Sequence, residues 1–506
     1  MNHPNISETK KFTSDIIWVA FSQVLSLLLS VITLPVLTKN FSTDLYGVWA
    51  QIGVTVGLIT PILILHLSTA LVRFLAAEED KNKRRKAFGA MLWPILVFCG
   101  FALSISLLLR DNLSTLLFAD TKYSLFIPLA FLWATMSALF SFSLSYLRAR
   151  GMIKKLSVIS IILAFAKMAV IVILAMTGME LEWIISFIII AQAILVIVVF
   201  FSVIKEIGIP WPQFEGLKRY LAFSIPLLPL GILLWIINTS DRYLITHFLD
   251  LSQTGIYSAS YTLGSLIALF YGPISFVLFP TLSRLWEQKE PMKVKNYLEY
   301  STKLFLTFAI PGSIGLWVLS QPLLRTFTTP EYAVGGTLVL LIAIGVILLG
   351  LYQINVHIIL LMHQNKWLPP MIGLAAAVNI GLNIILIPAI GILGAAISTI
   401  VSFFILAVIV FVWTRRAIKY RVDLKFLFKV AVATSVMAIC LFFMHVSSIL
   451  SIVLAIVTGL IIYLLILLLL KTFSRQDFKL IKEALSGLSP KQFRKESMPT
   501  DISESP

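Results

Sequence analysis

One lysine stands in the middle of a long apolar stretch. Lys167 is the central residue of the stretch 157–177, and no Asp or Glu takes such a central position in any other stretch. A charge at the centre of a bilayer costs about 2.5–3.5 kcal/mol on insertion scales, and such residues face a bundle interior or a wet cavity. Snorkelling to the interface is hardest from the middle of a span. We therefore predict that Lys167 is an electrostatic partner for an anionic substrate.

A second charged pair lies near the end of another apolar stretch, 219–247. Asp241 and Arg242 are adjacent, and Asn238 lies one helical turn before Arg242 on the same face. Two interpretations remain open. The pair could be a local ion pair at a helix end. Alternatively, Arg242 and Asn238 bind an anionic substrate, and Asp241 is a protonatable coupling group.

Two further ionisable residues belong to the stretch 45–72 and its end. Arg73 follows the last apolar residues and precedes the acidic run 78–80. A positively charged flank is the favoured interpretation, and binding of substrate at the mouth of a cavity is the alternative. For His66, a contact between helices is favoured, and a role as proton carrier in ion coupling is the alternative.

Polar residues also recur at helical spacing within apolar stretches. Ser22, Ser26, Ser30 and Thr33 are separated by four, four and three residues, which places them on one stripe. The stripe could serve close helix packing or form a polar cavity wall that hydrogen-bonds sugars. Asn379 and Asn383 are four apart in 367–387. When Gly178 is aligned with Gly391, Asn379 falls close to the counterpart of Lys167, which favours a shared cavity lining.

The elements that carry these residues must lie in lipid. The chain has 506 residues, of which 59% are hydrophobic and 13% charged, whereas soluble domains contain about 25% charged residues. Such a chain cannot cover a water-facing surface. Unbroken apolar runs such as 452–470 indicate membrane helices rather than the alternating strands of a barrel. No basic soluble domain is present that could bind nucleic acid.

Fourteen stretches satisfy the rule that a span needs about 20 largely apolar residues. We predict helices near 15–38, 45–72, 87–109, 123–147, 157–177, 182–204, 219–247, 254–283, 303–321, 331–361, 367–387, 391–413, 428–445 and 449–470.

The distribution of basic residues predicts the orientation of these spans. With the N-terminus inside, all but six of the 40 Lys and Arg residues fall in cytoplasmic segments, as the positive-inside rule requires. Lys167 lies within a span, and the outer ones are Lys39, Arg110, Lys122, Arg242 and Arg325. Both termini are therefore expected in the cytoplasm. The formal charge of +16 reflects this topology, and contact of the cytoplasmic basic residues with anionic lipids is sufficient to explain it.

Two segments repeat at a constant offset of 208 residues. Gly47 pairs with Gly255, and Trp49 pairs with Tyr257. An even number of spans separates them, so the repeat is parallel and its axis runs along the membrane normal. Transporters are often built from such repeats, with the substrate site at the midplane between the halves.

The repeat predicts the domain organisation. Two pseudo-symmetric six-helix lobes surround a central cavity, followed by two additional helices and a cytoplasmic tail with an amphipathic helix. The expected boundaries are 1–204 for the N-terminal lobe, 205–218 for a cytoplasmic linker, 219–413 for the C-terminal lobe, 414–470 for helices 13 and 14, and 471–506 for the tail.

Five short motifs stand out along the chain. They are DRYLI at 241–245, GIYSASY at 255–261, LYGVW at 45–49, NIGLN at 379–383 and GILGAA at 391–396. These motifs resemble the polysaccharide-exporter family, which includes the O-antigen and capsule flippases often called Wzx. The family belongs to a superfamily that also holds multidrug exporters and the lipid II flippase. The resemblance covers the first twelve helices.

This resemblance implies a two-lobed bundle whose cavity opens alternately to each side of a bacterial inner membrane. The implied activity is flipping of undecaprenyl-pyrophosphate-linked oligosaccharide repeat units. The alternatives are a cation-coupled multidrug exporter, a lipid II flippase and a membrane oligosaccharide polymerase. An exporter of cationic drugs would need acidic groups in its cavity. A polymerase would need catalytic groups outside the membrane, typically on a large outer loop.

The expected partners follow from this activity. They are the lipid-linked oligosaccharide, membrane lipids and, as candidate protein partners, a polysaccharide polymerase and a chain-length regulator. The chain is expected not to be an enzyme and to need no cofactor. Its sequence contains no phosphate-binding loop for ATP hydrolysis, and proton or sodium coupling is left open.

Overall fold

The chain folds as an all-helical membrane protein. The structure, a computed structural model, describes residues 6–420, 423–446 and 448–472. Within this part, fourteen helical segments are long and apolar enough to cross a membrane, and there is no strand. The predicted fold class is confirmed. The amphipathic helix and tail predicted for 471–506 lie outside the described residues from residue 473 onward.

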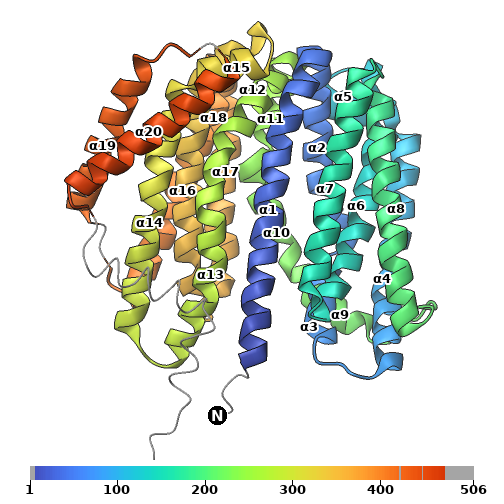
Figure 1. The fold of residues 1–506 in the computed structure, drawn as a ribbon. Coiled ribbons are helices and arrows are strands. Elements are labelled where there is room, and N and C mark those ends of the chain that lie inside the picture. Colours follow the sequence, from blue (N-terminus) through green and yellow to red (C-terminus); the bar gives the residue numbers. More distant parts are fainter. Residues whose placement is uncertain (1–5, 421–422, 447, 473–506) are drawn as a thin grey trace, which may run out of the picture.

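The first six spans form the N-terminal lobe, on one side of the molecule (Figure 1). Two helices, α2 and α3, cover the second predicted span, of which α2 alone is long and apolar enough to cross a membrane, and α5 is a short helix after the third span. The lobe comprises α1 (Ile6–Asn40), α2 (Thr43–Ile64), α3 (Leu67–Leu75), α4 (Lys81–Leu108), α5 (Arg110–Phe118), α6 (Phe126–Ala149), α7 (Ile153–Met176) and α8 (Leu181–Ile207).

The next six spans form the C-terminal lobe, and two further helices pack on its outside against α14. The lobe comprises α9 (Leu217–Ser224), α10 (Leu228–Thr239), α11 (Asp241–Phe248), α12 (Leu251–Gly264), α13 (Ala268–Glu287), α14 (Pro291–Val318), α15 (Ser320–Phe327), α16 (Gly336–Leu361), α17 (Leu368–Ile390) and α18 (Ile392–Ala417). The outer pair is α19 (Leu424–Phe442) and α20 (Ile449–Leu469).

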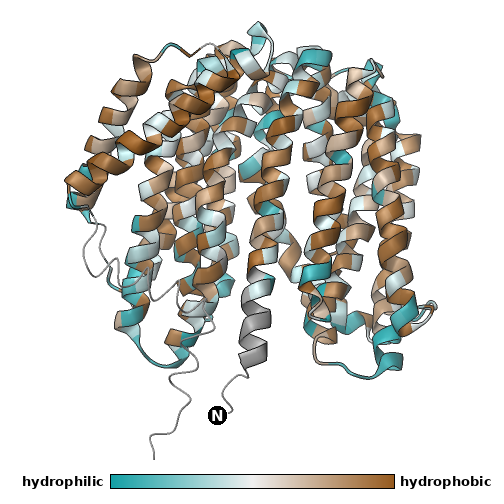
Figure 2. Cartoon of the chain, viewed as in Figure 1, coloured by the Kyte–Doolittle hydropathy of each residue, from teal (hydrophilic) through white to brown (hydrophobic). Residues whose placement is uncertain are grey.

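Lipid is the solvent for the outer surface of this bundle. Large apolar side chains such as Ile197 and Phe201 on α8 and Leu468 on α20 are more than half exposed. Figure 2 shows hydrophobic residues along the middle of the helices and hydrophilic residues gathered towards their ends. An exposed apolar surface of this extent would drive aggregation in water. The pattern is that of a multi-pass membrane protein.

The two ends of the bundle differ in charge. We call the end at which α4 begins the basic face, since it carries the cluster 81–86 together with Arg150, Lys205 and Arg416. The other end, where α1 meets α2, is called the opposite face. Several helix starts are fixed by capping carboxylates. Asp80, for example, accepts hydrogen bonds from the backbone of Asn82 and Lys83 at the start of α4.

The prediction of one continuous helix over 45–72 is wrong, because the chain leaves the helix after residue 64. Leu65 and His66 have φ values of 52° and 53°, in the left-handed region, so α2 ends at Ile64 and α3 begins at Leu67. Non-glycine residues in this region cost about 1–3 kcal/mol each, and they persist only where the surrounding structure holds them. The imidazole of His66 lies against α10, with Nε2 3.1 Å from where a Cβ on Gly231 would stand.

The lobes meet most tightly near the opposite face, where α2 crosses α12. A Cβ on Gly47 would stand 2.0 Å from the carbonyl oxygen of Leu251, and a Cβ on Gly255 would stand 2.4 Å from that of Thr43. The hydroxyl of Ser252 donates to Thr43 Oγ1 at 2.7 Å. The two glycines paired in the sequence repeat therefore pack against each other, and their missing side chains allow backbone to touch backbone.

A different chemistry joins the lobes at the basic face, where α3 packs on α9. The guanidinium of Arg73 lies 4.3 Å from the ring centroid of Phe223, and that of Arg219 lies 4.6 Å from the ring centroid of Phe74. Tyr220 packs on Phe74 as well, with 5.2 Å between ring centroids. This contact consists of alternating cations and aromatic faces rather than ion pairs.

Candidate functional site: a cationic cavity in the N-terminal lobe

A cavity of about 310 Å³ opens between α1, α2 and α7, and Lys167 stands in its wall. Among the described residues, its polar lining consists of that one ammonium group, four hydroxyls and an indole, without a carboxylate. The lining residues are Ser26, Leu29, Ser30, Thr33, Trp49, Ser160, Leu163, Ala164, Lys167, Met168 and Ile171. The cavity therefore presents one positive charge and several groups able to hydrogen-bond a sugar.

Lys167 is half-buried and has no ion-pair partner among the described residues. Its Nζ instead lies 5.2 Å from the ring centroid of Trp133 on α6. The indole of Trp133 is held by its own hydrogen bond, since Nε1 donates to Gln192 Oε1 on α8 at 3.2 Å. The lysine is thus oriented by an aromatic face, and its charge remains available to an anion in the cavity.

Only part of the predicted serine stripe lines the cavity. Ser26 and Ser30 line the cavity, whereas Ser22 does not; it is buried and donates to the carbonyl of Val19 at 2.8 Å. The hydroxyls of Ser26 and Ser30 donate to backbone carbonyls of α1 at 2.8 and 2.6 Å. Each hydroxyl oxygen still has lone pairs that can accept a hydrogen bond from a ligand.

Asp241 and Arg242 lie in the C-terminal lobe, in a network of their own. Arg242 Nη1 is 3.3 Å from Asp241 Oδ1, both side chains are buried, and Tyr257 donates its hydroxyl proton to Asp241 Oδ2 at 2.5 Å. The guanidinium also lies 4.3 Å from the ring centroid of Tyr261. The geometry is that of a local, internally satisfied ion pair, which was one of the two predicted interpretations.

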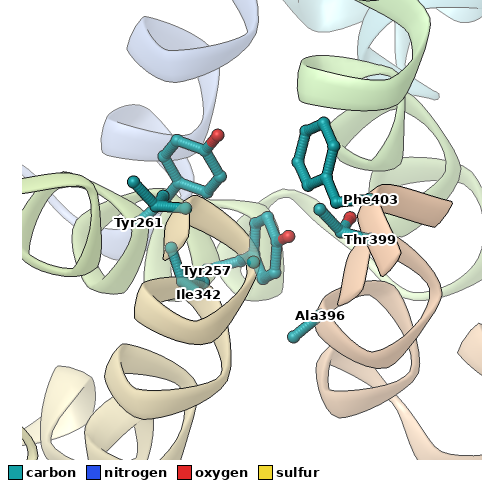
Figure 3. Close-up of a pocket in the computed structure, with 8 residues that line it drawn as sticks. Tyr257, Tyr261, Ile342, Ala396, Thr399 and Phe403 are labelled. Atoms are coloured by element: carbon teal, nitrogen blue, oxygen red, sulfur yellow. The ribbon is translucent and has the colours of Figure 1, made fainter. Parts of the chain in front are cut away.

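A small cavity in the C-terminal lobe adjoins the same two tyrosines. Figure 3 shows the rings of Tyr257 and Tyr261 on one side and Thr399 and Phe403 of α18 on the other. The hydroxyl of Thr399 is buried and has no hydrogen-bond partner among the described residues. This cavity has no direct contact with Lys167, and its lining residues all belong to the C-terminal lobe.

The asparagines predicted as substrate contacts do not line the cavity of Lys167. Asn379 and Asn383 are fully buried on α17, where Asn383 Nδ2 donates to Asn379 Oδ1 at 3.1 Å. Asn238 donates to the carbonyl of Leu234 within α10. None of the three lines the cavity of Lys167. The counterpart of a residue under a parallel repeat lies in the other lobe, so the alignment of Asn379 with Lys167 did not imply a shared wall.

Arg73 and His66 lie outside the cavity as well. Arg73 belongs to the contact between α3 and α9 at the basic face, and His66 is at the break of the second span. Sequence reasoning missed Trp133 and Gln192, which hold the lysine in place. Gln192 was the available signal, because it is a lone amide inside one of the most apolar spans of the chain.

Comparison with known proteins identifies the family of this chain. Residues 36–335 match the family described as polysaccharide biosynthesis protein. The chain belongs to this family. The matched range includes Lys167, and both glycines of the contact between Gly47 and Gly255 fall within it.

Similar curated proteins are named as flippases or as a transport protein. The probable low-salt glycan biosynthesis flippase Agl15 of Haloferax volcanii is 22% identical over 192 residues, which cover 38% of this chain and 41% of that protein. The probable flippase AglR of the same organism is 29% identical over 32% of this chain and 34% of its own length. The succinoglycan biosynthesis transport protein ExoT of Rhizobium meliloti is 25% identical over 66% of each chain. The matches to the first two span less than half of those proteins.

Solved structures with the same fold include a lipid II flippase and a multidrug transporter. The lipid II flippase MurJ in an inward closed conformation superposes with a TM-score of 0.74 at 16% identity, covering 89% of this chain and 97% of that one. A multidrug resistance transporter of the MATE family in an inward-facing conformation gives a TM-score of 0.57 at 14% identity, covering 81% and 94%. At these identities the likeness concerns the fold alone.

Proposed function

We propose that the chain is a flippase that moves undecaprenyl-pyrophosphate-linked oligosaccharide repeat units from the inner to the outer leaflet by alternating access. The repeat units are those of an O-antigen, a capsule or an exopolysaccharide. The observation that carries the proposal is the cavity of Lys167 in a chain of the polysaccharide biosynthesis family. Its single cation and its hydroxyls match a substrate that combines an anion with sugar hydroxyls.

The composition of the cavity argues against transport of cationic drugs. An organic cation would be repelled by the Lys167 ammonium, and the lining residues offer no carboxylate to bind it. The apolar part of the lining, which includes Leu163 and Met168, leaves the ammonium in surroundings less polar than water. An anion is attracted more strongly there than it would be in bulk water.

The remaining predicted residues keep their roles as proposals. Substrate contacts are proposed for Arg242, Arg73, Asn238, Asn379, Asn383 and Ser22, and ion coupling by protons or sodium for Asp241 and His66. The positions of Arg73 and His66 support roles in movement more than in binding. Arg73 joins α3 to α9, and His66 sits at the break of the second span against α10. Both would change surroundings if the lobes parted at the basic face.

Alternating access is supported by where the lobes touch. Hydrogen bonds between lobes are concentrated from the opposite face towards the middle of the bundle. They include the bonds that join Ser252 to Thr43, Trp235 to the carbonyl of Val54 and Tyr243 to Thr55. The lobes are therefore sealed at the opposite face in this state. Transport would require this seal to open while the contact between α3 and α9 holds.

Deletion of the gene in its native host tests the proposed function. We expect loss of surface polysaccharide together with accumulation of lipid-linked repeat units in the membrane, because units that cannot cross stay at the leaflet where they are made. The measurements are immunoblotting of surface polysaccharide and extraction of the lipid-linked pool. Unchanged polysaccharide, or loss without accumulation, would contradict the proposal.

The proposed topology places the basic face and both termini in the cytoplasm of a bacterial inner membrane. Reporter fusions after Asp80, Met152 and Glu290 are expected to be active as cytoplasmic fusions, and those after Glu180 and Asp250 as external ones. The reason is the gathering of Lys and Arg at one face. A cytoplasmic signal at Asp250 would show that the span count before it is wrong.

A further inference from the structure

Trp133 stands between the cavity and the interior of the N-terminal lobe. One side of its indole faces Lys167, whose Nζ lies 5.2 Å from the ring centroid, and the ring packs on Trp49 with 5.6 Å between centroids. Trp49 lines the cavity, whereas Trp133 is only 7% exposed and does not. The two indoles thus form a wall with an exposed layer and a buried layer.

The buried layer is fixed by a chain of hydrogen bonds. Trp133 Nε1 donates to Gln192 Oε1 at 3.2 Å, and Gln192 Nε2 donates to Ser137 Oγ at 3.0 Å. Gln192 is 2% exposed. A buried amide in an apolar span is costly unless both of its polar ends are satisfied, and here each end has a partner. The chain of hydrogen bonds fixes the plane of the Trp133 ring.

An aromatic partner leaves the charge of Lys167 in place, whereas a carboxylate partner would neutralise it. The face of an indole attracts a cation through the quadrupole of its ring, but it carries no net charge. The ammonium is therefore held in place without being neutralised. A carboxylate in that position would cancel the charge and compete with any anionic ligand.

We propose that Trp133 is a positioning residue that holds the Lys167 ammonium towards the cavity, and that Trp49 is a platform on which a sugar ring stacks. The site then takes a pyranose ring that carries an anionic group next to it. This anion could be a phosphate on the anomeric carbon or a carboxylate on the sugar itself. The proposal rests on the proposed function, since it names the substrate group bound at the same site.

The chain contains a geometric twin of this arrangement that serves as a matched control. Trp413 Nε1 donates to Gln364 Oε1 at 2.6 Å, and Trp413 packs on Trp367 with 5.4 Å between ring centroids. The guanidinium of Arg416 lies 4.4 Å from the Trp413 ring centroid. This twin lies at the basic face of the C-terminal lobe, outside the cavity of Lys167.

The test measures binding of four probes to the purified full-length protein in detergent, by ligand-induced thermal shift. The probes are glucose 1-phosphate, glucuronic acid, inorganic phosphate and methyl glucoside. We expect at least one of the two anionic sugars to bind more tightly than phosphate or methyl glucoside. The anionic sugar that binds more tightly identifies whether phosphate or carboxylate is the natural anion.

Variants separate the two tryptophans. Trp133→Leu should weaken every anionic probe about tenfold, since a desolvated cation–π contact contributes on this order. Trp49→Leu should weaken the anionic sugars and leave inorganic phosphate unchanged. Trp413→Leu should change none of them. Trp133→Phe combined with Gln192→Leu keeps an aromatic face, and it should restore part of the binding lost in Trp133→Leu.

Several outcomes would overturn the proposal. They are equal effects of Trp133→Leu and Trp413→Leu, loss of phosphate binding in Trp49→Leu, and absence of binding of any anionic probe to the wild-type protein. A purely structural role for Trp133 would lower the unliganded melting temperature without changing the ligand-induced shift. The proposed function fails separately, when deletion of the gene leaves surface polysaccharide unchanged.

Discussion

Replacement of Lys167 by alanine is expected to abolish surface polysaccharide without lowering the amount of protein in the membrane. The proposed substrate is an anion, and this ammonium is the one charged group among the described residues that line the cavity. Removing a charge from the middle of a span makes insertion easier rather than harder, by about 2.5–3.5 kcal/mol on insertion scales. A loss of transport therefore cannot be attributed to failed insertion. The measurement is surface polysaccharide in a deletion strain complemented with each variant.

Two companion variants sharpen this test. Lys167→Arg should keep most activity, because a guanidinium carries the same charge and also stacks on an indole. Lys154→Ala is the matched control, since Lys154 lies on the same helix with its Nζ 5.3 Å from the ring centroid of Trp18, but outside the cavity. Full activity of Lys167→Ala, or equal losses in the Lys167 and Lys154 variants, would refute an electrostatic role for Lys167.

Substitution of Gly47 by alanine is expected to prevent the lobes from closing at the opposite face. Its Cβ would stand 2.0 Å from the carbonyl oxygen of Leu251, and a backbone atom cannot rotate away. Overpacking costs about 1–3 kcal/mol, which at its upper end shifts an equilibrium roughly a hundredfold. Surface polysaccharide should fall accordingly, because a transporter that cannot close on one side cannot complete its cycle.

A cysteine pair reports directly on this closure. In a background with Cys99 and Cys440 replaced by alanine, Thr43→Cys with Ser252→Cys should form a disulfide, since the native hydroxyls are 2.7 Å apart. Gly47→Ala should lower the cross-linking yield. Gly53→Ala is the control on the same helix, because among the described residues no atom from beyond its own helical turn lies within 4 Å of the position of its Cβ. Unchanged cross-linking in Gly47→Ala would show that the contact can relax.

The fold could be predicted from the sequence because the patterns that indicate it are local and repeated. Apolar stretches of span length predicted the fourteen helices, and the offset of 208 residues paired Gly47 with Gly255, which the structure brings into contact. The lining of the cavity could be predicted from the sequence only in part. Lys167 stood out as a lone mid-span charge, and the spacing of Ser26 and Ser30 placed both on the face of α1 that the structure turns towards it.

The rest depended on contacts between distant segments. The helix break at Leu65 and His66 involves no proline or glycine at the broken positions. Pro61 precedes it by four residues but did not predict the break, because Pro35 and Pro94 lie inside continuous helices of the same chain. The contact between Trp133 and Lys167 depends on residues of α6, α7 and α8. The sequence alone does not show which aromatic ring packs against which cation. Asn379 was aligned with Lys167 by the repeat, yet symmetry relates the two lobes rather than bringing equivalent residues together.

Neither of the two contacts that seal the lobes, α2 on α12 and α3 on α9, is built from an ion pair. At the opposite face the seal is backbone against backbone, and at the basic face it is cations on aromatic rings. Exposed charges are screened over about 8 Å at physiological ionic strength, but a contact of backbone against backbone is not. Added salt should therefore leave the seal at the opposite face largely unchanged, whereas the contact at the basic face is made by the exposed arginines Arg73 and Arg219 and can respond to salt. A dependence of transport on ionic strength would then report on the basic face or on the encounter between Lys167 and its anion, and not on the seal at the opposite face.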